Sequence, residues 1–298
     1  MLLLQNVTKV FDTVRAVDDL SMEVESGDIY GLLGPNGAGK TTTIRMIMGI
    51  IRPDSGMIQL DDDPITVETK DRIGYLPEER GLYQKMKLRE TVEYFASLKN
   101  LDPDRVRDRT NSYLDRFDLL PRAEDKIEEL SKGNQQKVQF IISIIHSPQL
   151  LILDEPFSGL DPVNQVLLKE IIGELREQGT TVLLSTHQME QVEKLCERIC
   201  LIHKGSAVLR GNLREIKREY GSRTVRIQSD ASLEGVREDG VFHHTEMQND
   251  TLIGELKDDI QPHEYLKSLA ERVPVRRFEV VEPTLEQIFV DQVRGGGE

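Results

Sequence analysis

The sequence contains no tryptophan, only two cysteines and few aromatic residues, which make up 5% of the chain. Cys196 and Cys200 have no further cysteine and no nearby histidine at the spacing of a metal-ligand set, so we expect two buried, reduced thiols. Basic residues are also in the minority, 38 against 52 acidic residues, and the net charge is −14. Because binding to a phosphate backbone needs a basic face, free nucleic acid is not an expected partner.

Long apolar runs are missing as well. No run approaches the roughly 20 residues that a helix needs to cross a bilayer. The opening MLLLQNVTKV lacks the charged start and the long apolar stretch of a signal peptide. We therefore expect a cytoplasmic protein whose membrane role, if it has one, goes through a partner. With 298 residues, the chain is long enough for two domains.

The pattern of apolar residues differs between two parts of the chain. Over residues 1–220, short aliphatic strands alternate with helices, which predicts an α/β fold with a doubly wound parallel sheet. A mainly helical insert is expected over about residues 82–147, and the stretch RPDSGMIQLDDDP is expected to form a hairpin. We interpret its acidic triplet, residues 61–63, as a solvated turn rather than a cation site. Residues 222–298 mix strand-like and helical segments and predict a small α+β domain.

The stretch GPNGAGKT fits the phosphate-loop pattern G-x-x-x-x-G-K-[ST]. It lies between an expected strand and an expected helix, TTTIRMIMGII, which is the context that this pattern requires. Glycines let backbone N–H groups curl around phosphate oxygens, Lys40 can reach the β- and γ-phosphates, and the Thr41 hydroxyl can hold Mg²⁺. The expected ATP-binding residues are Gly34, Pro35, Asn36, Gly37, Ala38, Gly39, Lys40, Thr41 and Thr42.

A second candidate stretch, LLILDEP, has the pattern of a buried strand that ends in two carboxylates. Taken alone, such a pair is as well explained by ordinary loop residues. Behind a phosphate loop, Asp154 is expected to hold the Mg²⁺ shell and Glu155 to polarise the attacking water. The two stretches together predict a magnesium-dependent ATP site.

These motifs resemble those of the ATP-binding subunit of ATP-binding-cassette (ABC) transporters. The resemblance covers residues 1 to about 220 and is carried by GPNGAGKT, LSKGN, LLILDEP, SGLD and STHQ, in the order and spacing of that family. Residues 222–298, with EPTLEQIF near the end, resemble the extension of the bacterial sodium-efflux-type exporters. The resemblance implies a P-loop NTPase cassette with a parallel sheet core, an antiparallel β subdomain and a helical subdomain.

The resemblance also implies that two cassettes dock head to tail, so that each ATP lies between the phosphate loop of one and the LSKGN stretch of the other. Ser131 and Gly133 would then meet the γ-phosphate of the partner's ATP, whereas the alternative is a plain helix N-cap. His187 would contact the γ-phosphate and steady the water, Asp161 would link the two sites, and Phe11 would stack on adenine. Each of these three also has an ordinary structural explanation, as a polar strand end, a loop cap and a core residue.

Three positions depart from the family pattern. Lys132 replaces the first glycine and Asn134 the glutamine of the common LSGGQ, and Lys132 adds positive charge near the phosphates. Glu78, in YLPEERG, stands where the family usually has a glutamine. A carboxylate at that position can still coordinate Mg²⁺ or its waters, but its negative charge beside three phosphates can slow hydrolysis.

The leading hypothesis is an Mg²⁺-dependent ATPase that is peripheral on the inner face of the cell membrane. It would form a homodimer, or a heterodimer with a second cassette, and power a separate integral membrane permease in the direction of export. Two alternatives stay open: a soluble cassette ATPase that is not coupled to a membrane, and an ATP-binding regulator with little turnover. The sequence has neither the second cassette nor the long heptad run expected of the soluble alternative.

Overall fold

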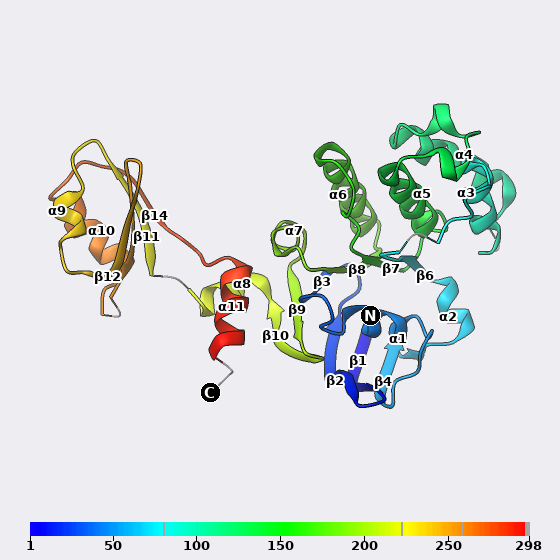
Figure 1. Cartoon of the computed structure of the whole chain (residues 1–298), viewed down its shortest axis with the longest axis horizontal. Coiled ribbons are helices and arrows are strands. Elements are labelled where there is room, and N and C mark those ends of the chain that lie inside the picture. Colours follow the sequence, from blue (N-terminus) through cyan, green and yellow to red (C-terminus); the bar gives the residue numbers. More distant parts are fainter. Residues whose placement is uncertain (80, 100, 222, 258, 296–298) are drawn as a thin grey trace. The chain divides into compact units, whose positions relative to one another are not determined.

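The chain folds into two compact units, Met1–Leu213 and Arg214–Glu298 (Figure 1). The computed structural model describes residues 1–79, 81–99, 101–221, 223–257 and 259–295. Across these described ranges, no helix is both long enough and apolar enough to cross a membrane.

A six-stranded sheet forms the centre of the first unit, with the strand order β10-β9-β3-β8-β7-β6. Its strands are β3 (Ile29–Leu33), β6 (Ile73–Leu76), β7 (Leu150–Asp154), β8 (Thr181–Thr186), β9 (Arg198–His203) and β10 (Ser206–Asn212). All run parallel except β10, which pairs antiparallel with β9 at one edge. Every residue of β3, β7 and β8 is buried, as continuous aliphatic runs in a parallel sheet require. The predicted parallel sheet core is confirmed.

A second, antiparallel sheet of the first unit has the order β2-β1-β4-β5. Its strands are β1 (Leu2–Phe11), β2 (Val14–Val24), β4 (Ser55–Leu60) and β5 (Asp63–Pro64). A cluster of buried apolar residues joins this sheet to the central sheet through α1 (Lys40–Ile47). The helix α1 is shorter than TTTIRMIMGII suggests, because Gly49 takes a left-handed φ of 58° and donates its N–H to the Met46 carbonyl.

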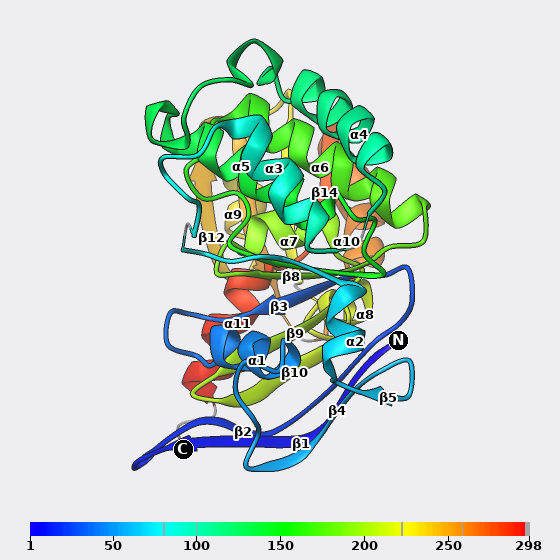
Figure 2. The same cartoon turned by 90° about the vertical axis from the view of Figure 1, so that its right-hand side faces the viewer.

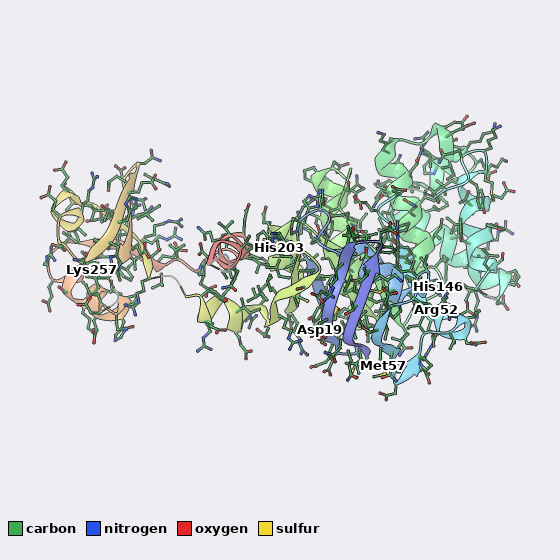
Figure 3. All side chains as sticks on the ribbon, turned by 60° about the horizontal axis from the view of Figure 1, so that its bottom comes forward. Asp19, Arg52, Met57, His146, His203 and Lys257 are labelled. Atoms are coloured by element: carbon green, nitrogen blue, oxygen red, sulfur yellow. The ribbon has the colours of Figure 1, made fainter. Side chains whose placement is uncertain are left out.

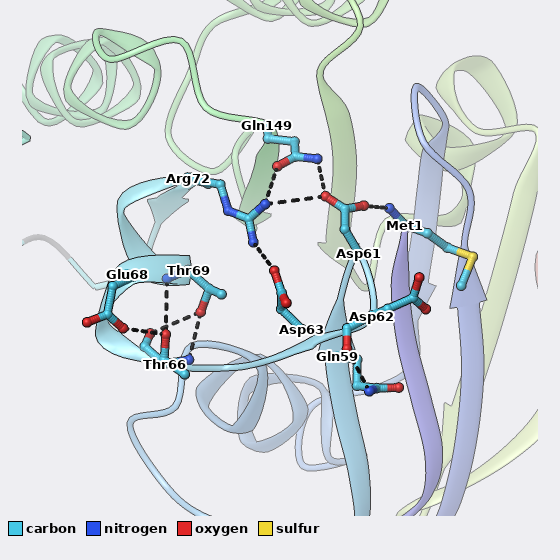
Figure 4. Close-up of polar contacts among 10 residues, drawn as sticks. All are labelled: Met1, Gln59, Asp61, Asp62, Asp63, Thr66, Glu68, Thr69, Arg72 and Gln149. Carbon is cyan, nitrogen blue, oxygen red and sulfur yellow. Dashed lines mark hydrogen bonds and ion pairs between the residues drawn. The ribbon is translucent and has the colours of Figure 1, made fainter.

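The expected hairpin near residue 60 is present, since β4 pairs with β5, although the longer partner of β4 is β1. The acidic triplet in the turn of this hairpin is not simply solvated, because two of its members have partners in the protein. Asp61 accepts hydrogen bonds from the Met1 ammonium group and from Gln149, and it lies 3.5 Å from the Arg72 guanidinium, which also contacts Asp63 (Figure 4). These cationic and amide partners occupy Asp61, so the triplet ties the turn to the edge of the central sheet.

The helical insert contains α3 (Leu88–Ser97), α4 (Pro103–Arg116) and α5 (Lys132–Ile144), with single 3₁₀ turns at Leu120–Arg122 and Ile127–Glu129. Figure 2 shows these three helices on the opposite side of the central sheet from β1, β2 and β4. The end of α5 is joined to β6 by His146, labelled in Figure 3, whose Nε2 lies 3.2 Å from the Ile73 carbonyl oxygen. Burial lowers the pKa of His146 to about 4, so the ring is neutral near pH 7. The other helices are α2 (Val67–Asp71), α6 (Pro162–Glu177) and α7 (Met189–Leu195).

The second unit is built around a four-stranded antiparallel sheet with the order β12-β13-β11-β14. Its elements are α8 (Leu213–Glu219), β11 (Thr224–Ser229), α9 (Glu234–Arg237), β12 (Phe242–Gln248), β13 (Thr251–Leu256), α10 (Pro262–Ala270), β14 (Val275–Val280) and α11 (Leu285–Gly295). The βαββαβ succession from β11 to β14 is the ferredoxin-like arrangement. Its core is apolar, with Val225, Ile227 and Leu252 at its centre.

The last helix, α11, begins with a reciprocal cap. The Thr284 N–H donates to the Gln287 side chain and the Gln287 N–H to the Thr284 hydroxyl, at 2.9 and 3.2 Å. This pair forms a capping box at the start of α11.

Candidate nucleotide-binding site

The loop between β3 and α1 has a backbone that only glycine fits at two positions. Gly34 and Gly39 take φ values of 150° and 112°. A Cβ at Gly34 would lie 2.2 Å from the Ile202 carbonyl oxygen, and one at Gly39 would lie 2.4 Å from the Ala16 carbonyl oxygen. The loop is therefore packed against β9 and β2, and its conformation is set before any ligand arrives.

Lys40 begins α1, and its ammonium group turns back over the loop. Its Nζ donates to the carbonyl oxygens of Gly34 and Pro35, at 2.7 and 3.2 Å. The residue is only 7% exposed, and burial lowers the pKa of its ammonium group. A cation held over the N-terminus of an eight-residue helix is an arrangement that binds phosphate.

A cavity of about 510 Å³ opens beside this loop. Of the predicted ATP-binding residues, its walls include Asn36, Gly37, Gly39, Lys40, Thr41 and Thr42. The three carboxylates predicted to act on Mg²⁺ or the attacking water also line it, namely Glu78, Asp154 and Glu155. Gly34, Pro35 and Ala38 belong to the same loop but do not line the cavity. The structure thus brings together residues that lie more than a hundred positions apart in the chain.

Asp154, the last residue of β7, is 1% exposed. Its Oδ1 accepts a hydrogen bond from the Ser185 hydroxyl at 2.7 Å, and its Oδ2 lies 3.3 Å from the Thr41 hydroxyl. Burial raises the pKa of Asp154, the Ser185 hydrogen bond opposes this rise, and the nearby Glu78 and Glu155 carboxylates add to it. A hydroxyl and a carboxylate oxygen at this separation are hard oxygen donors of the kind that Mg²⁺ prefers.

Glu155 follows directly and is held by β8. Its Oε2 accepts from the Thr186 hydroxyl at 2.8 Å, and its Oε1 accepts from the His187 backbone N–H at 2.9 Å. The His187 Nδ1 lies 2.7 Å from the same Oε1. Glu155 has a left-handed φ of 50°, uncommon outside glycine, while its own N–H donates to the Ser185 carbonyl at 2.9 Å. The carboxylate is therefore fixed in direction, and the half-exposed His187 ring lies against it.

Besides those three loop residues, five predicted residues do not line this cavity in the single chain: Phe11, Ser131, Gly133, Asp161 and His187, the last of which contacts Glu155. Phe11 is 45% exposed, and the Lys9 ammonium group lies over its ring. Ser131 caps α5 by accepting the Asn134 N–H at 3.3 Å, and Asp161 caps α6 by accepting the Asn164 N–H at 2.9 Å. Gly133 packs near the loop before Asp161, since a Cβ there would lie 3.2 Å from the Gly159 carbonyl oxygen.

Sequence reasoning missed residues at two places. The Ser185 and Thr186 hydroxyls donate hydrogen bonds to Asp154 and Glu155. Two hydroxyl residues directly before His187 are the sequence feature that could have indicated this role. Arg15, near the start of β2, and Lys204, in the turn between β9 and β10, also line the cavity. Lys204 is carried there because the Gly205 N–H donates to the Ala38 carbonyl at 2.9 Å, a contact for which the sequence offers no signal.

The glycine-shaped loop, the buried lysine and the carboxylates at the ends of parallel strands together define a P-loop nucleoside triphosphatase. The ABC transporter family matches residues 17–158, and the family "ATP-binding protein DrrA1-3-like, C-terminal domain" matches residues 211–293.

Individual relatives agree with this class. The ABC transporter ATP-binding protein YhaQ of Bacillus subtilis is 44% identical over 294 residues, which cover 98% of this chain and 98% of YhaQ. The Nod factor export ATP-binding protein I of Cupriavidus metallidurans is 35% identical over 258 residues, 85% of each chain. A solved ATP-binding subunit of an ABC transporter superposes with a TM-score of 0.70 at 30% identity, covering 74% of this chain and 93% of that one. The chain belongs to the ABC transporter family as an ATP-binding subunit.

Proposed function

We propose that the chain is the Mg²⁺-dependent ATP-hydrolysing subunit of an exporter and acts on a separate membrane permease from the cytoplasmic face. The observation that carries the proposal is the position of the Asp154 and Glu155 carboxylates at the cavity beside the glycine-shaped loop. In this proposal Lys40 exchanges its loop carbonyls for the phosphates, and Glu155 orients the attacking water and accepts its proton. His187, which contacts Glu155 Oε1, keeps that carboxylate directed at the water.

Thr41 and Asp154 fit a Mg²⁺ ion, because their oxygens lie 3.3 Å apart at the cavity wall. Glu78 lines the same cavity and would act on the ion directly or through its waters. The ion would neutralise charge on the transferred phosphoryl group.

A dimer is supported by the positions of the predicted residues, which lie at two separate places on one chain. Ser131, Gly133 and Asp161 do not line the cavity of their own chain. We propose that a second cassette, either another copy or a related chain, presents these residues to the ATP head to tail. ATP would close the two cassettes and hydrolysis would open them.

Coupling to a permease is supported by an apolar surface on the helical insert. Tyr83, Tyr94 and Leu98 are 53%, 40% and 55% exposed. The Tyr83 ring stacks on the half-buried Phe95 at a centroid distance of 6.1 Å. Exposed aromatic clusters are typical of protein contacts, and Glu78, at the cavity, lies only five residues before Tyr83. The direction of transport rests on the likeness to the Nod factor export protein.

The test is co-purification from membranes of the source cell. Tagged Glu155→Gln protein, trapped with ATP and Mg²⁺, is expected to bring down one polytopic membrane protein in near-stoichiometric amount. Tyr83→Ser combined with Tyr94→Ser is expected to reduce that recovery while ATP binding, measured separately, persists. Ribosomal proteins, or no membrane partner, would instead favour a soluble cassette ATPase.

A regulator with little turnover is the second candidate, favoured by the extra Glu78 carboxylate at the cavity. Phosphate release by the purified protein, compared with Lys40→Ala, separates the two functions. Release that depends on Lys40 eliminates the regulator.

A further inference from the structure

The start of α5 carries an unpaired positive charge. Lys132 is the first residue of this helix, and its side chain is exposed. Within the described part of the chain, its ammonium group has no hydrogen-bond or ion-pair partner. The neighbouring Ser131 fixes the helix start by capping the Asn134 N–H. Lys132 is therefore displayed on a defined backbone beside the residues proposed to face a second cassette.

The nucleotide cavity contains three groups of the opposite charge, Glu78, Asp154 and Glu155. Three cations, Lys40, Arg15 and Lys204, line it as well. Lys40 already donates to two loop carbonyls, and Arg15 is paired with Asp18 at 2.7 Å. A triphosphate carries more negative charge than one divalent ion cancels, so binding of Mg²⁺ and ATP makes the cavity more negative.

Glu78 is the member of this group that can meet a partner. Asp154 and Glu155 are 1% and 6% exposed and are held by hydroxyl and backbone donors from within the chain. The Glu78 side chain is exposed and follows the end of β6 by two residues. Both Glu78 and Lys132 stand where the family pattern has an uncharged residue, so the two departures place opposite charges on the two faces that would meet.

We propose that Lys132 of one copy pairs with Glu78 of a second copy when two cassettes close around ATP. This inference rests on the proposed function, because it needs the head-to-tail dimer. Both side chains would lose hydration when the dimer closes, so removal of one partner would leave the other as a desolvated, unpaired charge. Without Lys132, Glu78 would face the triphosphate with no cation from the partner cassette beside it. Without Glu78, Lys132 would still lie near phosphate, so the loss of the lysine should cost more than the loss of the glutamate.

The test is a double-mutant cycle on ATP-dependent dimerisation. In the Glu155→Gln background, sedimentation velocity with ATP and Mg²⁺ gives the dimer dissociation constant of each variant. We expect Lys132→Gln to weaken the dimer about 10–100-fold, and Glu78→Gln less than about 5-fold. On top of Glu78→Gln, Lys132→Gln should cost less than about 5-fold, because no carboxylate is left unpaired. Lys132→Arg should keep the dimer, and Lys132→Glu with Glu78→Lys should recover part of what either reversal loses.

A matched control is offered by Glu79, which is adjacent to Glu78, is also exposed and does not line the cavity. In the Glu79→Gln background, Lys132→Gln should weaken the dimer as much as it does in the parent protein. Thermal melting of every variant checks the fold, and both positions are at the surface.

The outcomes separate this pairing from the proposal on which it rests. If the parent Glu155→Gln protein forms no ATP-dependent dimer, both proposals fail. If it dimerises but the costs of Lys132→Gln and Glu78→Gln simply add, the dimer stands and the pairing is wrong. The same holds if Lys132→Gln has no effect.

Discussion

The two units of this chain place their polar groups differently. In the first unit, Asp154, Glu155, Ser185 and Thr186 are all buried where the parallel strands β7 and β8 end. In the second unit, the central cluster is apolar, and Asp239 pairs with Arg272, whose side chain is 44% exposed. Parallel strands end at one edge of a sheet and can gather carboxylates there, whereas antiparallel neighbours point in opposite directions. The parallel sheet of the first unit thus has two buried carboxylates at its edge, whereas the antiparallel sheet of the second unit has an apolar core.

The largest expected effect compares one carboxylate from each unit. Glu155→Gln should lower the ATP turnover number by about 10²–10⁴, the usual contribution of a general base, while ATP binding is kept. Asp239→Asn removes a carboxylate that pairs with Arg272 and lies outside the nucleotide cavity, and it should leave turnover within about twofold. Steady-state phosphate release, with ATP binding measured by equilibrium titration, provides both numbers.

Either of two results would break this contrast. Unchanged turnover in Glu155→Gln would remove its assignment as the base. A large loss in Asp239→Asn would mean that the second unit takes part in the catalytic cycle.

The next effect in size tests whether the two units unfold independently. Leu151 in β7 and Leu252 in β13 are each fully buried, and truncation of a buried leucine to alanine usually costs about 2–5 kcal/mol. Differential scanning calorimetry should show two transitions, with Leu151→Ala lowering one and Leu252→Ala the other. ATP with Mg²⁺ should raise only the transition that Leu151→Ala lowers, because a ligand stabilises the unit that binds it. A single transition that both substitutions lower together would show one cooperative body.

Much of the first unit is predictable from the sequence because its motifs are local. The phosphate loop needs glycines at fixed spacing, and LLILDEP and TTVLLST contain short aliphatic runs that are typical of buried parallel strands. Arg15 and Lys204 were not predictable as cavity residues. Arg15 reaches the cavity from β2, whose Ala16 carbonyl lies against Gly39, and Lys204 reaches it because the Gly205 N–H donates to the Ala38 carbonyl of the loop. That contact joins segments with no common pattern.

The second unit is less predictable for a related reason. Its strand β12 has the sequence FHHTEMQ, with only Phe242 buried. An edge strand with one buried residue has no apolar alternation to signal it, and α9 is a helix of only four residues. The strand β11 is recognisable because Val225 and Ile227 alternate with polar neighbours, and β13 is recognisable from its short apolar pair, Leu252 and Ile253.

The smallest expected effect is on stability, and it should have opposite signs in the two units. Burial raises the pKa of Asp154, so its ionised form is disfavoured by folding. A carboxyl whose folded pKa is raised adds stability below its unfolded pKa, about 3.9, and loses it as pH rises through the folded value. Asp154→Asn should therefore stabilise the protein at pH 7 by about 0.5–2 kcal/mol while it abolishes Mg²⁺-dependent turnover. This gain should shrink towards zero as pH falls towards 4.

Asp239→Asn leaves Arg272 without its carboxylate and should cost about 1 kcal/mol at pH 7. Thermal denaturation between pH 4.5 and 8, without nucleotide, measures both. A loss of stability in Asp154→Asn at pH 7 would mean that the Ser185 and Thr41 hydroxyls stabilise the ionised carboxylate by more than burial penalises it.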